Sequence, residues 1–215
     1  MTIKIAFLIL FTIIFLMFGC APKAANNNLH AGMDHNTMPM NHDGMDHGSM
    51  DHSTMQSSQN AAKAPYDLQF LDTMIAHHRG ADDMAAPCAT KAEHAEIKTL
   101  CSNIISSQQK EIDQMKAWRE KWFSAEAPAI NMEMAGMKDS MKGMDMKKLG
   151  ALAASDFDLE FIKQMIPHHE GAVIMGSEAL QKSTKDEIKI LSNAIIKAQE
   201  TEIKQMKEWQ AAWSK

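Results

Sequence analysis

The sequence predicts an all-α protein, a four-helix bundle made of two duplicated helical hairpins and preceded by a disordered Met/His-rich arm. Two observations lead to this prediction. Residues 66–122 align without a gap onto residues 157–213, with identical residues at 25 of 57 positions. Within each copy, apolar residues recur every three or four positions, which is the spacing of one helix face. No stretch alternates in the way that a half-buried β-strand requires.

The composition narrows the function classes. The chain has 215 residues, a net charge of -5 and a pI near 6.0. Nucleic acid is not an expected partner, because a domain that binds it needs a basic surface. Three cysteines are too few for a disulfide scaffold. The unusual feature is the content of 20 methionines and 10 histidines beside a single tyrosine.

The first 19 residues are predicted to be a signal peptide of the lipoprotein type. The run from Ile5 to Phe18 is polar only at Thr12, which makes it too short to span a bilayer but suitable as the apolar part of a signal peptide. It closes on Gly19-Cys20, which resembles the bacterial lipoprotein signal, in which the cysteine becomes the lipidated first residue. An uncleaved anchor and ordinary cleavage nearby are the alternatives. We expect the protein in the cell envelope, facing the periplasm and anchored to a membrane through Cys20, or periplasmic or secreted without that lipid.

Residues 20–64 are predicted to form a disordered arm that binds copper. Residues 30–55 hold six methionines, five histidines and four aspartates, and the triplet Met-Asp-His occurs three times. With almost no aliphatic residues, this tract cannot form a core. Thioethers and imidazoles favour Cu(I), whereas imidazole with carboxylate suits Cu(II). Compositional drift in a linker and an oxidant sink based on methionine sulfoxide are the alternatives. The candidate ligands are Met33, His35, His42, Met45, His47, Met50 and His52.

Residues 65–215 are predicted to form the bundle, with hairpins at 65–124 and 155–215. A single hairpin cannot bury both its apolar faces, so the two copies should pack together. Ser155 is predicted to be the N-cap of the second copy. Pro167 is predicted to kink the helix and to aim the second histidine pair differently from the first. The first copy's stripes run through Phe70, Met74, His77, Ala81 and Met84, and then through Ile97, Leu100, Ile104, Gln108, Glu111, Met115, Trp118 and Trp122.

The connector between the hairpins, residues 125–154, carries six further methionines. Because they lie outside the predicted helices, we expect them to have no core to fill. They are Met132, Met134, Met137, Met141, Met144 and Met146.

Two cysteines lie on opposite arms of the first hairpin. Cys88 and Cys101 are replaced in the second copy by Ala179 and Ser192, so the pair appears together or not at all. Export implies an oxidising compartment, and a disulfide is therefore predicted. Two buried thiols and metal ligation by the pair are the alternatives.

Each copy also carries two adjacent histidines that follow a methionine by three and four residues, a spacing that lets the side chains converge. A hairpin turn near residue 92 would place Met74 level with Glu111, and His77 level with Gln108. Adjacent helical residues point about 100° apart, so we expect one histidine of each pair to face inward and the other to lie in a groove or at the surface. For any single histidine, a structural role is the simpler interpretation. The candidate ligands are Met74, His77 and His78, with Met165, His168 and His169 in the second copy. The residues expected to contact these ligands, without binding the metal, are Gln108, Glu111, Gln199 and Glu202.

Several other sites are absent from the sequence. A ferritin-like di-iron site needs two Glu-x-x-His motifs, and the chain has none. It also lacks a Gly-rich phosphate loop, a nucleophile elbow and zinc-type cysteine spacing.

The duplicated motif resembles domain-of-unknown-function family 305. It reads Asp-x-x-Phe-x-x-x-Met-Ile-x-His-His-x-Gly-Ala-x-x-Met, followed by Glu-Ile and Gln-x-x-Glu-Ile-x-x-Met-x-x-Trp, within roughly residues 65–213. The family's better-understood members are CopM-like periplasmic copper-binding proteins, which implies a ferritin-like four-helix bundle that binds copper through Met and His. The chain departs from the motif at Ala76, where proline is commoner, and in its cysteine pair. The matching residues are Met74, His77, His78, Met84 and Met115, and Met165, His168, His169, Met175 and Met206.

These observations predict an exported copper-binding protein that sequesters copper or passes it on, contributing to copper resistance or homeostasis. Cu(I) is the favoured ion and Cu(II) the alternative. Metal binding is expected rather than catalysis. The other hypotheses are a ferritin-like enzyme that oxidises Cu(I) to Cu(II), and a metal-free envelope lipoprotein that scavenges oxidants. The expected partners are copper ions, a membrane through the lipid anchor and another copper-handling protein.

Overall fold

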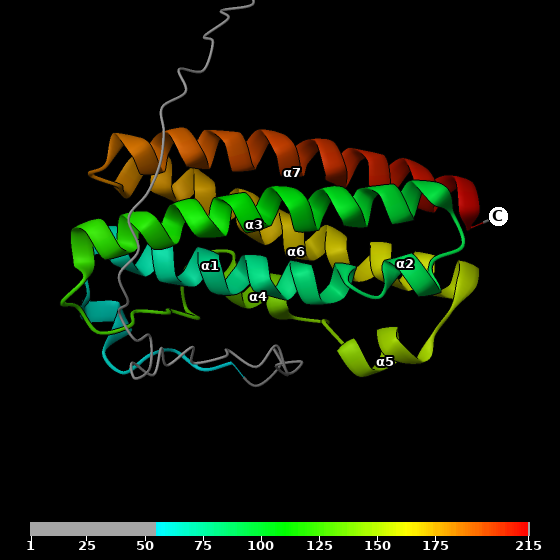
Figure 1. The fold of residues 1–215 in the computed structure, drawn as a ribbon, viewed down its shortest axis with the longest axis horizontal. Helices are drawn as coiled ribbons and strands as arrows, with labels where there is room; N and C mark the ends of the chain where they lie inside the picture. Colours follow the sequence, from blue (N-terminus) through cyan, green and yellow to red (C-terminus); the bar gives the residue numbers. More distant parts are fainter. Residues whose placement is uncertain (1–54, 215) are drawn as a thin grey trace, which may run out of the picture. The chain divides into compact units, whose positions relative to one another are not determined.

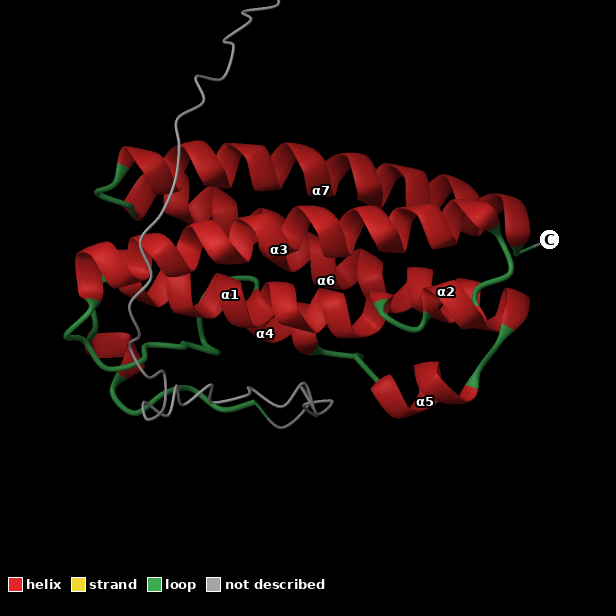
Figure 2. Ribbon diagram, viewed as in Figure 1, coloured by secondary structure: helices red, strands yellow, loops and turns green. Residues whose placement is uncertain are grey.

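Four long helices form a bundle in the computed structural model, which describes residues 55–214. α1 (Tyr66–Ala85) packs against α3 (Ala95–Phe123), α6 (Ala154–Lys182) packs against α7 (Asp186–Trp213), and contacts between α1 and α6 join the two hairpins (Figure 1). No strand occurs within these residues (Figure 2). The predicted all-α bundle of two hairpins is confirmed. The signal peptide, Cys20 and the candidate ligands of the arm lie outside the described residues.

Four short helical segments accompany the bundle: η2 (Ala61–Lys63), α2 (Cys88–Lys91), α4 (Met137–Met141) and α5 (Met146–Ala151). The first hairpin turns between α2 and α3, close to the predicted position. A disulfide joins Cys88 to Cys101 across this turn, with the two Cα atoms 6.3 Å apart. No helix among residues 55–214 is long and apolar enough to cross a membrane.

The connector packs against the bundle and contributes to its core, which corrects the prediction that its methionines have no core to fill. Four of the six are buried and the other two are partly buried against the same apolar cluster. α4 lies against α6 and positions them there. Unbranched side chains adapt to irregular space, so a methionine-rich segment without helical periodicity can still fill a core. The buried four are Met134, Met137, Met141 and Met144.

Two buried aspartates fasten each hairpin to the other. Asp158 in α6 accepts hydrogen bonds from the backbone N–H of Glu93, at 3.2 Å, and of His94, at 2.8 Å, just before α3. Asp67, its equivalent in α1, accepts hydrogen bonds from the Thr184 backbone N–H at 3.3 Å and hydroxyl at 2.6 Å, just before α7. The first helix of each hairpin is therefore hydrogen-bonded to the other hairpin, at the loop that precedes that hairpin's second helix. Each carboxylate satisfies N–H groups that would otherwise be orphans at a helix start.

Two predictions about α6 are wrong. The helix begins at Ala154 with Ala153 as its N-cap, so Ser155 already lies inside it. Pro167 lies within the continuous helix, and the predicted kink stays a prediction. The second histidine pair is not aimed differently: the ring centroids lie 6.1 Å apart in the first pair and 6.2 Å apart in the second, and the outer histidine of each pair lies 2.7 Å from a glutamate of its own hairpin. The packing of both hairpins into one core fixes the histidines in equivalent positions despite the proline.

Candidate metal site

Four histidines meet at the centre of the bundle. His77 and His168, which occupy equivalent positions in the two copies, lie with ring centroids 3.8 Å apart and ring planes inclined by 32°. His77 donates a hydrogen bond from Nε2 to the backbone oxygen of His168, at 3.1 Å. This bond fixes the tautomer of His77, because the proton on Nε2 leaves Nδ1 as the nitrogen with a lone pair. Within the described residues that Nδ1 is buried and has no hydrogen-bond partner.

The outer histidines have the same environment in both hairpins. His78 Nε2 lies 2.7 Å from Glu111 Oε2, and His169 Nε2 lies 2.7 Å from Glu202 Oε2. Each histidine thus donates to a carboxylate across its own hairpin. A carboxylate in this position orients the imidazole and increases the basicity of its other nitrogen. Both Nδ1 atoms are buried without a hydrogen-bond partner in residues 55–214.

The predicted division into one inward and one surface histidine is wrong. All four rings are fully buried. The predicted register is also off by one turn, because Glu111 meets His78 rather than lying beside Met74. The sequence correctly paired the histidine region of α1 with Glu111 of α3, but only the packed bundle shows which ring is in contact.

Burial sets the protonation of this cluster. Desolvation is the main cause that holds the pKa of His77 well below its usual range, and charges on His78 and His169 act in the same direction. His77 is therefore neutral at ordinary pH, which is the form that binds metals. On the next turn of α1, burial raises the pKa of Asp82 to about 6, although the neighbouring His78 acts against it.

The six methionines of the hairpins are all fully buried. They belong to the single apolar cluster that fills the bundle, so packing already accounts for their presence. On their helices, Met74 and Met165 precede the histidines by one turn and share their face. Ligation by these residues stays a prediction. The six are Met74, Met84, Met115, Met165, Met175 and Met206.

The ends of two methionine side chains and one histidine ring meet beside Gly80, at a place that the sequence did not predict. A Cβ built on Gly80 would lie 3.3 Å from His168 Nε2, 3.5 Å from Met144 Cε and 3.8 Å from Met141 Cε. One imidazole nitrogen and two thioether side chains therefore surround a single point on α1. Both methionines are almost fully buried, with 8% of each side chain exposed.

Because Gly80 has no side chain, these three groups approach the backbone of α1 closely. Gly171, the equivalent glycine of α6, has a different neighbour, because α4 of the connector packs directly over it. A Cβ on Gly171 would overlap Ser140 of α4. The connector therefore makes the two copies unequal. It places the methyl ends of Met141 and Met144 near Gly80, whereas its backbone and Ser140 lie against Gly171.

Sequence reasoning missed Met141 and Met144 as candidate ligands. Their approach to His168 depends on how an aperiodic connector folds back over the bundle, which spacing does not report. The high methionine content of the connector is the sequence feature that could have indicated these two residues as candidate ligands. Among residues 55–214, no group of three or more His, Cys, Asp or Glu side chains is arranged to hold a metal ion. A metal at this site would therefore depend on thioethers as well as imidazole.

Comparison with known proteins identifies the family. The model of the family "Domain of unknown function (DUF305)" matches residues 19–119 and residues 67–210. The chain belongs to the DUF305 family. The two matches share residues 67–119 of the first hairpin, and the second match also covers most of the second hairpin. No curated protein matches the chain significantly.

Solved structures of DUF305 and related proteins resemble the bundle. CopM in the Cu(II)-bound form is 42% identical, with a TM-score of 0.60 over 68% of this chain and 97% of its own. CopM in the Cu(I)-bound form is 41% identical, with a TM-score of 0.58 over 68% of this chain and 96% of its own. A secreted DUF305 protein from Streptomyces coelicolor is 25% identical, with a TM-score of 0.62 over 73% of this chain and 95% of its own.

Proposed function

We propose that this protein binds copper, preferentially as Cu(I), at the point enclosed by His168, Met141 and Met144. The observation that carries the proposal is the convergence of one imidazole nitrogen and two thioether side chains on the space beside Gly80. Thioether sulfur is soft and neutral, so such a site favours Cu(I) over the hard cations Mg²⁺ and Ca²⁺. CopM, at 41–42% sequence identity, has been crystallised with Cu(II), Cu(I) and Ag, which supports the same metal class here.

The surrounding groups suit a monovalent soft ion. The His168 ring lies against the ring of His77, which is neutral because burial lowers its pKa. No carboxylate is among the three groups that surround the point, so a hard dication would be poorly neutralised there. The carboxylates Glu111 and Glu202 instead bind the outer histidines. We propose that these two histidine–glutamate pairs fix the orientation of the histidine cluster and do not ligate the ion.

The wider role follows from this binding. We propose that the protein sequesters copper, or passes it to another copper-handling protein, and does so in the cell envelope as a lipoprotein anchored through Cys20. The signal-like sequence of residues 1–20 supports the location. A binding role is proposed rather than catalysis, because the solved relatives at 41–42% identity are described by the metal they carry.

Competitive titration tests the copper site. The mature protein is titrated anaerobically with Cu(I) against a chromogenic chelator, and compared with the double variant M141L/M144L. Leucine keeps the volume but removes the sulfur, so stability should change by less than about 1.5 kcal/mol per site. We expect loss of one equivalent of tightly held Cu(I), or at least an approximately tenfold weaker affinity, which corresponds to about 1.4 kcal/mol.

The matched control is M134L/M137L, which alters two other buried connector methionines. It should retain the full number of sites and the parental affinity. Equal losses in both double variants would show that leucine disturbs the connector generally. Parental binding in M141L/M144L would refute ligation at this point and leave the arm as the main candidate.

A further inference from the structure

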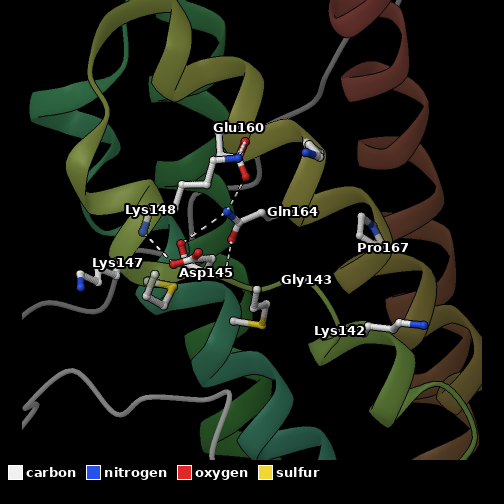
Figure 3. Close-up of a pocket in the computed structure, with 11 residues that line it drawn as sticks. Lys142, Gly143, Asp145, Lys147, Lys148, Glu160, Gln164 and Pro167 are labelled. Carbon is white, nitrogen blue, oxygen red and sulfur yellow. Dashed lines mark hydrogen bonds and ion pairs between the residues drawn. The ribbon is translucent and has the colours of Figure 1, made fainter.

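A lysine-rich pocket lies beside the candidate metal site and shares only Met144 with it. It encloses about 980 Å³ between the connector and α6 (Figure 3). Its lining includes Lys142, Lys147, Lys148 and Lys163 but only two carboxylates, so the wall carries a net charge of +2. Met144, which also lies beside Gly80, belongs to the same lining.

The two carboxylates are already engaged within the wall. Glu160 accepts hydrogen bonds from Lys148 Nζ at 2.6 Å and from Gln164 Nε2 at 2.9 Å. Asp145 accepts a hydrogen bond from the Lys148 backbone N–H at 2.7 Å (Figure 3). Although burial acts in the opposite direction, the hydrogen bonds from Lys148 and Gln164 keep the pKa of Glu160 below its usual value. Glu160 is therefore engaged by Lys148 and Gln164, and Asp145 by the backbone of the connector.

The remaining lysines are left for an external anion. Lys142, Lys147 and Lys163 are exposed, and none of them forms an ion pair with any carboxylate of residues 55–214. Lys163 also acts electrostatically on Glu160, although no ion pair joins them. Three exposed ammonium groups around one concave surface attract a ligand that carries several negative charges.

The sequence of the chain contains a segment with this charge. Residues 24–54 contain Asp34, Asp43, Asp46 and Asp51 and no lysine or arginine, which gives a net charge of -4 with neutral histidines. The described chain begins at Met55. This residue lines a second, smaller pocket that shares Lys142, Gly143 and Met144 with the lysine-rich one.

Hydrogen bonds hold this entry point in place. Ser58 N–H donates to the Ile130 oxygen at 2.8 Å, and the Met132 N–H donates to Ser57 Oγ at 3.0 Å. The chain is therefore fixed at Ser57 and Ser58, and Met55 lines the smaller pocket that adjoins the lysine-rich one. An extended chain advances by at most about 3.6 Å per residue, so Asp51, the nearest of the four aspartates, can lie no more than about 15 Å from Met55.

We propose that the lysine-rich pocket is the docking site for the chain's own acidic Met/His-rich segment, residues 30–54. Charge complementarity and the short tether favour this occupant over a separate acidic protein, because tethering gives an effective concentration of about millimolar. Docking would bring Met-Asp-His triplets to Met144, at the mouth of the candidate metal site. That consequence, transfer of copper from arm to bundle, rests on the proposed function, whereas the docking itself does not.

Lysine labelling without metal tests the docking. The mature full-length protein and the variant D34N/D43N/D46N/D51N are treated with an amine-acetylating reagent, and the rate at each lysine is followed by mass spectrometry. The variant keeps the tether and removes only the charges. We expect Lys142, Lys147 and Lys163 to react at least about threefold more slowly in the parent than in the variant. The difference should disappear in about 0.5 M salt, where exposed charges are screened within about 4 Å.

Exposed lysines on α3 and α7 are the internal controls, and Lys116, Lys197 and Lys204 should react equally in both proteins. A second variant, K147E/K163E, should raise the rate at Lys142 to that of the four-asparagine variant, whereas K197E/K204E should not. Equal rates at Lys142, Lys147 and Lys163 in the parent and the four-asparagine variant would overturn the proposal. Equal slowing at the control lysines would overturn it too, because the arm would then be attracted without a site. Since no metal is present, either failure leaves the copper proposal untouched.

Discussion

Substituting Gly80 by alanine closes the candidate metal site without removing any of its ligands. The added Cβ would lie 3.3 Å from His168 Nε2 and 3.5 Å from Met144 Cε. The added methyl group would narrow the space between His168 and Met144, where we propose that the ion binds.

The substitution should affect binding far more than stability. Alanine in the interior of a helix is favoured over glycine by about 0.8–1.0 kcal/mol. A contact at 3.3 Å requires His168 to shift by a few tenths of an ångström, which offsets part of this gain. We expect the melting temperature of G80A to stay within about 4 °C of the parent, the change that about 1 kcal/mol produces in a protein of this size.

Methyl NMR reports on this site alone, even when the arm also binds metal. The mature protein with ¹³C-labelled methionine methyl groups is titrated with Ag(I), a redox-inert substitute for Cu(I). In the parent, the signals of Met141 and Met144 should shift on binding, whereas in G80A they should stay fixed until at least about tenfold more Ag(I) is added. The control is G150A, because a Cβ on Gly150 meets no atom within 4 Å. Parental shifts of both signals in G80A would falsify the location of the site.

Three further substitutions test the architecture. G171A should lower the free energy of unfolding by about 2 kcal/mol or more, because the new Cβ overlaps Ser140 and forces the connector outward; a urea midpoint equal to the parent's would contradict this packing. D158N should cost about 1.5–3 kcal/mol, since a buried carboxylate loses charge-assisted bonds from the loop before α3, and hydrogen exchange should show earlier opening of that loop. C88A/C101S copies the residues that the second hairpin carries and should cost about 3 kcal/mol in non-reducing urea unfolding. The parent should show a similar loss after reduction, and an unchanged midpoint in both experiments would argue against the cross-link.

The bundle was predictable because its signals are local and repeated. Phe70 and Met74 recur as Phe161 and Met165 at the same spacing, and every one of these four side chains is fully buried. A helix places residues three and four apart on one face, so the buried stripe can be read from the chain before packing is known. The duplication further predicts that the two hairpins bury their apolar faces against each other.

The connector was not predictable for the opposite reason. Met137 and Met141 lie four residues apart, but their helix is only five residues long, too short for a stripe to stand out. Their burial depends on α4 reaching α6 at Gly171, where only a residue without Cβ allows contact. Such an approach is a property of two surfaces and leaves no periodicity in either sequence.

The sequence by itself determined the helical class, the duplicated hairpins and the histidines and methionines available as ligands, because composition and helical spacing are properties of the chain. Only the tertiary structure decided which ligands meet. It buried both histidines of each pair, joined His78 to Glu111 and brought Met141 and Met144 to His168. These contacts join residues from different elements, and their distances are fixed by how close-packed helices and a folded connector fill the same space.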